Sequence, residues 1–255
     1  MAKYRNYVIA KTLQEAYDLN QKKSSVIVGG NMWLHMCGLN RQTAIDLSAL
    51  GLEGVEETED AFVVGAMTSL REMETHAGLH EAFGGAFAAA LAPIVGTQFR
   101  RTATVGGSVY SRFGFSDVSA LLLALDADVV LFARGCVKLA EYQQEAWDRD
   151  IITHIRIPKG QTAAVESVRT SATDIPTLVC AAAGSERGVR IVLGARPARA
   201  QIVADGLKDW DMAALEEIAR GTRFGTNLRA GEAYRRKVAP VLMARAAAKC
   251  QEVQG

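Results

Sequence analysis

Charge imbalance, long apolar runs and targeting signals are all missing from this chain of 255 residues. Its 29 basic and 28 acidic side chains nearly cancel, so bulk charge gives no reason to expect binding to nucleic acid. No apolar run approaches the roughly 18 residues that span a bilayer, and residues 1–7 contain no apolar segment typical of a signal peptide. We therefore expect a cytoplasmic protein that binds neither nucleic acid nor a membrane.

Metal and nucleotide motifs are missing as well. The four cysteines are scattered without a C-x-x-C pair, so the chain by itself is expected to hold neither structural zinc nor an iron–sulfur cluster. His76 and His80 are four residues apart, but Gly78 separates them and no acidic partner is near, which favours a solvated helix face over a metal site. Neither G-x-G-x-x-G nor a P-loop occurs. The sequence therefore predicts no catalytic side chain and no metal ligand.

The first 150 residues alternate helical and strand patterns. A capping box at Thr12 and Glu15 precedes a helix that is expected to reach about residue 21, and the β-branched run at 25–28 predicts a buried strand. Further on, strands are predicted at 43–47, 61–65 and 128–132, and one Ala-rich helix at 79–91. With 49% hydrophobic residues, such a chain can bury a sizeable core.

The pattern changes after residue 150. Isoleucines alternate with polar residues from Ile151 to Pro158, and strands are predicted at 163–169, 177–183 and 189–193 without helices between them. Successive strands of this kind favour an antiparallel sheet. Two helices should follow, the first capped by Asp211.

Two glycine pairs stand where predicted strands end. Gly29-Gly30 follows the strand at 25–28, and Gly106-Gly107 follows Thr104-Val105. Glycine permits φ > 0 and a close approach of ligand to main chain, and successive N–H groups in such turns bind phosphate oxygens. We therefore predict a diphosphate between the two turns, and we expect Gly106→Val to abolish its binding while the fold stays largely intact. The predicted contacts are Ile27, Val28, Gly29, Gly30, Asn31, Met32, Ala103, Thr104, Val105, Gly106 and Gly107.

A second loop follows the glycine pair at 106–107. Ser116 or Asp117 is predicted to cap the apolar helix at 119–125. Phe113 and Phe115 lie just before this cap, where they either face a bound ring system or pack within the loop. Trp33 is predicted to belong to the core rather than to a ligand site.

Taken in order, five segments resemble a known family. They are V-G-G-N, V-G-A-M-T-S-L, Q-F-R-R-T-A-T-V-G-G, S-D and L-L-A-L-D-A, and the last helix adds a weaker match at Tyr234–Arg236. This order is similar to that of the FAD-binding subunit of molybdenum hydroxylases, the enzymes of the xanthine dehydrogenase and carbon monoxide dehydrogenase type. The resemblance covers most of residues 1–195.

The resemblance implies an α+β fold and a function. Two small α/β subdomains, 1–55 and 56–159, would form a PCMH-type FAD-binding domain, and an antiparallel sheet with helices would follow at 160–255. FAD would bind noncovalently with its pyrophosphate at the two glycine turns. Asp117 matches the acidic residue that reaches the cofactor in the family, and Ile151 lies where the family's strand borders the flavin.

The family also implies partners. An iron–sulfur subunit would deliver electrons that originate at a molybdopterin subunit, and NAD would be the acceptor. Two alternatives remain open from the sequence: a stand-alone flavoprotein oxidoreductase of the same fold, and a scaffold whose flavin site has decayed. Asn31-Met32, which stand where the family usually has Thr-Asp, and the Phe-rich loop before Asp117 support the scaffold.

Overall fold

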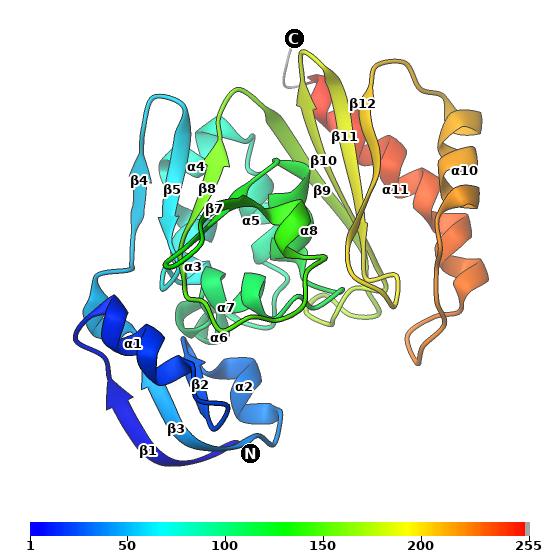
Figure 1. Ribbon diagram of the computed structural model, residues 1–255. Helices are drawn as coiled ribbons and strands as arrows, with labels where there is room; N and C mark the ends of the chain where they lie inside the picture. Colours follow the sequence, from blue (N-terminus) through cyan, green and yellow to red (C-terminus); the bar gives the residue numbers. More distant parts are fainter. Residues whose placement is uncertain (253–255) are drawn as a thin grey trace.

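The computed structural model describes residues 1–252, whose strands form three sheets that follow one another along the chain (Figure 1). The first sheet is parallel, in the order β1-β3-β2, and α1 packs on one of its faces. The hydroxyl of Thr12 accepts the N–H of Glu15, which confirms the predicted helix start. This part contains β1 (Lys3–Ile9), α1 (Leu13–Asn20), β2 (Ser25–Val28), α2 (Met32–Met36), β3 (Asn40–Asp46) and a 3₁₀ turn at Ser48–Leu50.

The second sheet has five antiparallel strands in the order β4-β5-β8-β6-β7. Its strands are β4 (Val55–Glu57), β5 (Ala61–Gly65), β6 (Asp128–Leu131), β7 (Gly135–Lys138) and β8 (Ile152–Pro158). The helices that accompany it are α3 (Leu70–Thr75), α4 (Ala77–Ala82), α5 (Ala86–Leu91), α6 (Thr97–Thr102), α7 (Val105–Tyr110), α8 (Asp117–Ala124) and α9 (Leu139–Tyr142).

The third sheet is antiparallel, as predicted, in the order β12-β11-β10-β9. Figure 1 shows both C-terminal helices on its outer face, where they bury one apolar side of β10 and β11. The elements are β9 (Thr162–Val168), β10 (Leu178–Ser185), β11 (Gly188–Gly194), β12 (Gln201–Leu207), α10 (Met212–Gly221) and α11 (Glu232–Glu252).

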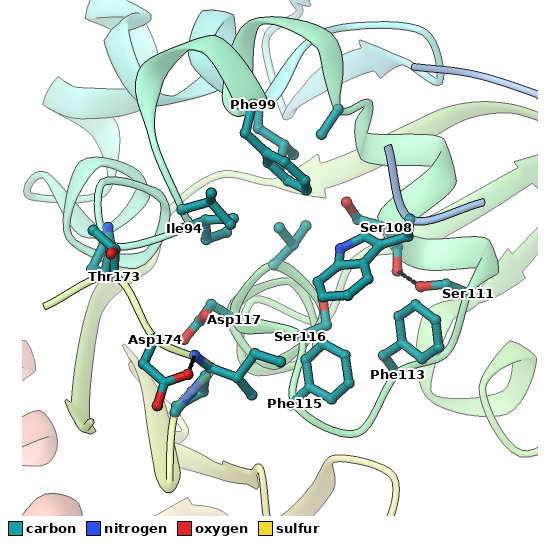
Figure 2. Close-up of a pocket in the computed structure, with 18 of the residues that line it drawn as sticks. Ile94, Phe99, Ser108, Ser111, Phe113, Phe115, Ser116, Asp117, Thr173 and Asp174 are labelled. Carbon is teal, nitrogen blue, oxygen red and sulfur yellow. Dashed lines mark hydrogen bonds between the residues drawn. The ribbon is translucent and has the colours of Figure 1, made fainter. Parts of the chain in front are cut away.

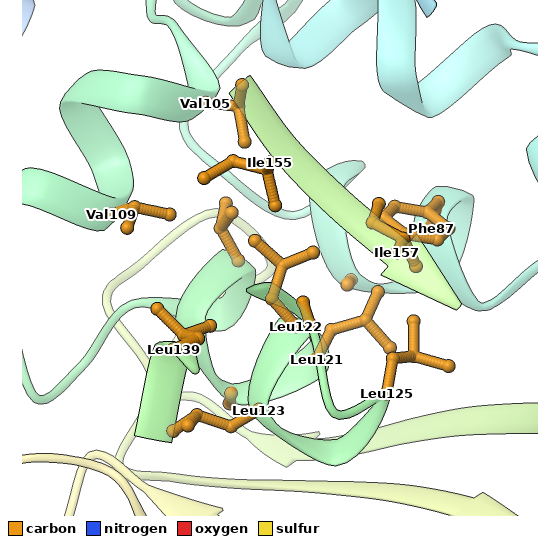
Figure 3. Close-up of a cluster of buried hydrophobic side chains, with 14 of the residues drawn as sticks. Phe87, Val105, Val109, Leu121, Leu122, Leu123, Leu125, Leu139, Ile155 and Ile157 are labelled. Carbon is orange, nitrogen blue, oxygen red and sulfur yellow. The ribbon is translucent and has the colours of Figure 1, made fainter. Parts of the chain in front are cut away.

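Helix α8 forms the centre of the molecule. Every residue from Asp117 to Ala124 is buried, because the helix is surrounded by both larger sheets and by neighbouring helices. Figure 3 shows Leu121 and Leu122 packing toward Ile155 and Ile157 of β8. The same apolar cluster continues into β10 and β11, so residues on both sides of position 160 share one core.

Two predictions about local structure were wrong, and four elements were missed. The Ala-rich helix is two helices, α4 and α5, because Gly84 and Gly85 adopt positive φ between them. Gly106 and Gly107 lie in the first turn of α7, not in a loop at a strand end. Strands β1, β7 and β12 and helix α6 were not predicted at all, since their apolar residues are too few or too irregularly spaced to stand out.

No helix within residues 1–252 combines the length and the apolar character needed to cross a membrane. The same residues contain no group of three His, Cys, Asp or Glu side chains arranged to hold a metal ion. The imidazole of His76 accepts the N–H of Leu79 and so caps α4.

Candidate cofactor-binding cleft

The first glycine pair connects β2 to α2 and forms a turn with free main-chain donors. Gly29 and Gly30 do not adopt positive φ; Asn31 does, at φ 54°. In the described part of the chain, the N–H groups of these three residues donate no hydrogen bond. They also stand at the N-terminal end of a helix, next to a left-handed residue. Such a turn is a concave anion site made of main-chain amides. We call residues 29–31 the amide turn.

The two predicted glycine segments are brought together. A Cβ on Gly30 would lie 1.6 Å from the carbonyl oxygen of Thr102, and a Cβ on Gly29 would lie 2.6 Å from the hydroxyl of Thr104. The glycines at 29–30 are therefore required for contact with the segment that links α6 to α7. No phosphate can therefore lie between Gly30 and Thr102.

The N–H groups of the second glycine pair donate to acceptors within the protein. The N–H of Val105 donates to Thr68, that of Gly106 donates to Ala66, and that of Gly107 donates to the Thr104 hydroxyl. A Cβ on Gly106 would lie 2.7 Å from the Ala66 carbonyl oxygen. The expectation that Gly106→Val leaves the fold intact was therefore wrong, because the space at Gly106 is filled by protein and not by a ligand.

A small, half-open cleft lies beside this junction and extends to the N-terminus of α8 (Figure 2). Its walls come from α2, from the segment between α5 and α8, and from the β9–β10 loop. The lining residues that bear on the argument are Trp33, Leu70, Ile94, Phe99, Ala103, Ser108, Phe113, Phe115, Asp117, Arg169 and Thr173–Pro176.

Asp117 lies in the cleft wall, at the first position of α8. The cap of this helix is Ser116, whose hydroxyl accepts the N–H of Ser119, so Asp117 is not the cap. Its carboxylate accepts a hydrogen bond of 2.6 Å from Arg169, and both side chains are almost fully buried. Burial raises the pKa of Asp117 from its ordinary 3.8 to about 6, although the Arg169 charge opposes the shift.

Arg169 also fixes the loop between β9 and β10. It donates to the Asp174 carbonyl oxygen at 2.7 Å, and Asp174 in turn accepts from Arg229 at 3.3 Å. The residues from Thr173 to Pro176 therefore form a wall of the cleft whose position is fixed by Arg169. Sequence reasoning missed Arg169 and this loop, because a charged residue at the end of a strand carries no signal of its own; only the pairing with Asp117 reveals its role.

Ile151 is not in this cleft. Its side chain is 1% exposed and packs with Ile45 and Leu52, between the first sheet and the second. Its predicted place next to the flavin stays a prediction, because no flavin is present and the cleft lining does not include Ile151. Trp33, which was predicted to be core only, lines the cleft and also packs against the central core.

The sequence of this chain matches a known family. Residues 2–160 match the family model described as the FAD binding domain in molybdopterin dehydrogenase. The chain belongs to this family. An uncharacterized relative, YgfM of Escherichia coli strain K12, is 28% identical over 221 residues, which cover 84% of this chain and 82% of YgfM.

Solved structures agree with the family at the level of fold. A carbon monoxide dehydrogenase chain from Hydrogenophaga pseudoflava has a TM-score of 0.88 at 21% identity and covers 99% of both chains. The corresponding chain of carbon monoxide dehydrogenase from Oligotropha carboxidovorans has a TM-score of 0.85 at 21% identity, covering 98% of both. A chain of quinoline 2-oxidoreductase from Pseudomonas putida 86 has a TM-score of 0.85 at 17% identity. The match covers 98% of this chain and 97% of the quinoline 2-oxidoreductase chain.

The cofactor of this family is FAD, and the residues present fit it. The amide turn offers N–H donors to a diphosphate without the cost of burying a lysine. The cleft beside it is mainly apolar and aromatic, with a few hydroxyl groups, as a planar ring system requires. The lining of the cleft includes Trp33, two residues after the amide turn, but none of residues 29–31.

Proposed function

We propose that this chain is the FAD-binding electron-transfer subunit of a multi-subunit molybdenum hydroxylase of the carbon monoxide dehydrogenase or xanthine dehydrogenase type. The observation that carries the proposal is the amide turn, whose three N–H groups donate no hydrogen bond in the described chain, in a fold that matches such enzymes over 99% of its length. The three units are residues 1–55 and 56–159, which hold the cofactor, and 160–255, which flank it.

FAD, when bound, supplies redox chemistry in one-electron and two-electron steps. The chain itself binds and orients it. The amide turn is the diphosphate site, together with the adjoining Thr104 hydroxyl that lies against Gly29. Asp117 and Arg169 hold the far wall of the cleft, since their pair ties α8 to the β9–β10 loop. No side chain of the cleft is required as an acid or a base.

The proposal includes partners and an acceptor. Electrons reach the flavin from an iron–sulfur subunit, which receives them from a molybdopterin subunit, and they leave to NAD.

The amide turn can be tested with one matched pair of variants. Asn31→Val and Asn31→Gly both lose the hydrogen bond of 3.0 Å between the Tyr4 hydroxyl and the Asn31 amide. Only valine disfavours the positive φ at this position. We expect the glycine variant to retain FAD, seen as a flavin band near about 450 nm, and the valine variant to lose it. Equal FAD retention in both variants would contradict the proposed diphosphate site.

The partner assignment needs a second experiment. Purified chain and co-expressed complex are each supplied with reduced nicotinamide and with hydroxylase substrates. We expect flavin reduction by the nicotinamide in either sample but hydroxylation only in the complex. Hydroxylation by the lone chain would favour a stand-alone flavoprotein. Purified chain that lacks flavin and cannot take it up would favour a scaffold with a decayed site.

A further inference from the structure

A groove with a volume of about 820 Å³ lies between the two C-terminal helices, α10 and α11. The inner faces of both helices are buried against the third sheet, so the groove opens on the outer side of the molecule, where Figure 1 shows α10 at the edge. The end of α10 is held beside the beginning of α11, because Arg236 donates to the carbonyl oxygen of Arg220 at 3.0 Å. We call this hollow the helix groove.

The two walls of the helix groove are stripes of residues spaced four apart along each helix. They are Met212, Glu216 and Arg220 on α10, and Ala233, Lys237 and Val241 on α11. Residues at this spacing share one face of a helix, so each stripe follows the groove for about two turns. Met212 is 44% exposed and Val241 is 41% exposed, so both apolar side chains are open to contact with another chain.

The charges that the groove leaves unpaired are one of each sign. Within residues 1–252, the exposed side chains of Glu216 and Lys237 form no salt bridge and no hydrogen bond, although they lie on opposite walls of one groove. Every other charged side chain that lines the groove belongs to a salt bridge within its own helix. These salt bridges are Arg220–Glu217 and Arg236–Glu232.

This balance of charge favours one occupant over others. A strongly acidic or strongly basic partner gains little from a groove whose two unpaired charges cancel, whereas a second copy of this chain presents the same two charges in complementary positions. Glu216 is midway along its stripe, and Lys237 is midway along the other. A second α10 that lies along the groove, in either direction, therefore brings its Glu216 opposite Lys237. Its Met212 then packs against Ala233 or Val241.

We propose that the helix groove is a surface for dimerisation, in which α10 of each copy lies in the groove of the other. Glu216 of one copy pairs with Lys237 of the second copy, and twofold symmetry forms the same pair again. The surface is short, about two helical turns on each wall, so the dimer should be reversible and should dissociate on dilution. The proposal does not depend on the cofactor, because no residue lines both the helix groove and the cofactor cleft.

Charge reversal in the full chain tests the reciprocal pairing. Glu216→Lys and Lys237→Glu each place like charges at both contacts of the dimer. Sedimentation velocity at low salt should therefore show the dissociation constant of either variant raised about ten-fold or more. In an equal mixture of the two variants, the positive positions of one face the negative positions of the other. We expect this mixture to dimerise as the wild type does.

Two variants with the same charge changes outside the groove are the matched controls. Glu59→Lys and Lys23→Glu alter exposed side chains of the first two sheets and their loops, and they should associate as the wild type does. Circular dichroism identifies any variant that fails to fold. Met212→Asp then provides a second test, because a charge placed in the apolar contact should also dissociate the dimer.

Three results would overturn the proposal. The wild-type chain could remain monomeric up to its solubility limit, the charge-reversal variants could dimerise as well as the controls, or their mixture could associate no better than either variant alone. Failure of a dimeric chain to bind FAD would instead overturn the proposed function and leave the dimer in place.

Discussion

The carbonyl oxygen of Thr102 occupies the position that a side chain at Gly30 would need, 1.6 Å from an ideal Cβ. Gly30→Ala must therefore push the end of β2 away from the segment between α6 and α7. Because the atom in the way belongs to the main chain, no rotamer change can relieve the clash. We expect a loss of about 2 kcal/mol or more in unfolding free energy, measured by urea denaturation, together with weakened FAD retention.

Gly221→Ala is the control for this substitution. Gly221 ends α10, does not adopt positive φ, and has no atom within 4 Å of its Cβ position. Alanine there should be neutral or slightly stabilising. If Gly30→Ala unfolded at the same denaturant concentration as Gly221→Ala, the contact between the two glycine segments would be refuted.

The second glycine pair should show a contrast between neighbours. Gly106→Ala meets the main-chain oxygen of Ala66 at 2.7 Å and its Cβ at 2.8 Å, whereas Gly107→Ala meets only the hydroxyl of Thr104 at 3.1 Å. Both sites are helical, so the backbone preference favours alanine equally. We expect Gly106→Ala to lower the thermal midpoint strongly and Gly107→Ala to change it little. Similar midpoints for the two variants would contradict this.

The sequence predicted most of the helices and strands, and it predicted one part of the candidate site, the amide turn. Periodic elements such as α1, β8 and the strands β9, β10 and β11 of the third sheet were confirmed, because each shows its burial pattern locally. The amide turn was anticipated from Gly29-Gly30, although its left-handed residue is Asn31 rather than a glycine. Local patterns of this kind are set by neighbours in the chain.

What the sequence could not reveal depends on contacts between distant segments. Gly106 looks like a ligand-contacting glycine until Ala66 is seen against it. Asp117 looks like a cap until Arg169, in the loop after β9, is seen to donate a hydrogen bond to its carboxylate. Ile151 continues the alternating pattern of β8, yet its side chain packs away from the cleft. In each case the residue type was informative, but the partner was not visible in the sequence.

The buried pair of Asp117 and Arg169 predicts a specific pH dependence. Burial raises the pKa of Asp117 to about 6 in the folded chain against an ordinary value of 3.8. Between these values the folded state holds a proton that the unfolded state has released. The stabilising contribution of Asp117 is therefore complete below about pH 4 and is lost as pH rises to about 6, by about 1.4 kcal/mol per pH unit within that window.

Asp117→Asn isolates this contribution, because asparagine has the same shape but cannot ionise. The difference in unfolding free energy between wild type and variant should fall as pH rises from about 4 to about 6, then stay level. The variant leaves the charge of Arg169 unpaired, and this adds an amount that does not depend on pH to the difference in unfolding free energy. A difference that increases with pH would mean that the pair lowers the pKa of Asp117 instead.

Arg235 should be the most stabilising charged residue of α11. Its side chain is fully buried and donates to the carbonyl oxygens of Thr177, Gly225 and Ala230 and to the Asn227 side chain, at 2.6–2.9 Å. Burial, with a smaller effect of the Arg229 charge, lowers its pKa.

Replacing Arg235 leaves these buried acceptors without donors, so Arg235→Met should lower the unfolding free energy by about 3 kcal/mol or more. Arg235→Lys keeps the charge, but a single ammonium cannot reach four acceptors in the arrangement that a guanidinium fork satisfies, and the loss should persist. Arg245→Met, at an exposed position of the same helix, is the control and should change stability by less than about 0.5 kcal/mol. Full stability of the lysine variant would show that charge, rather than the geometry of the donors, is what Arg235 contributes.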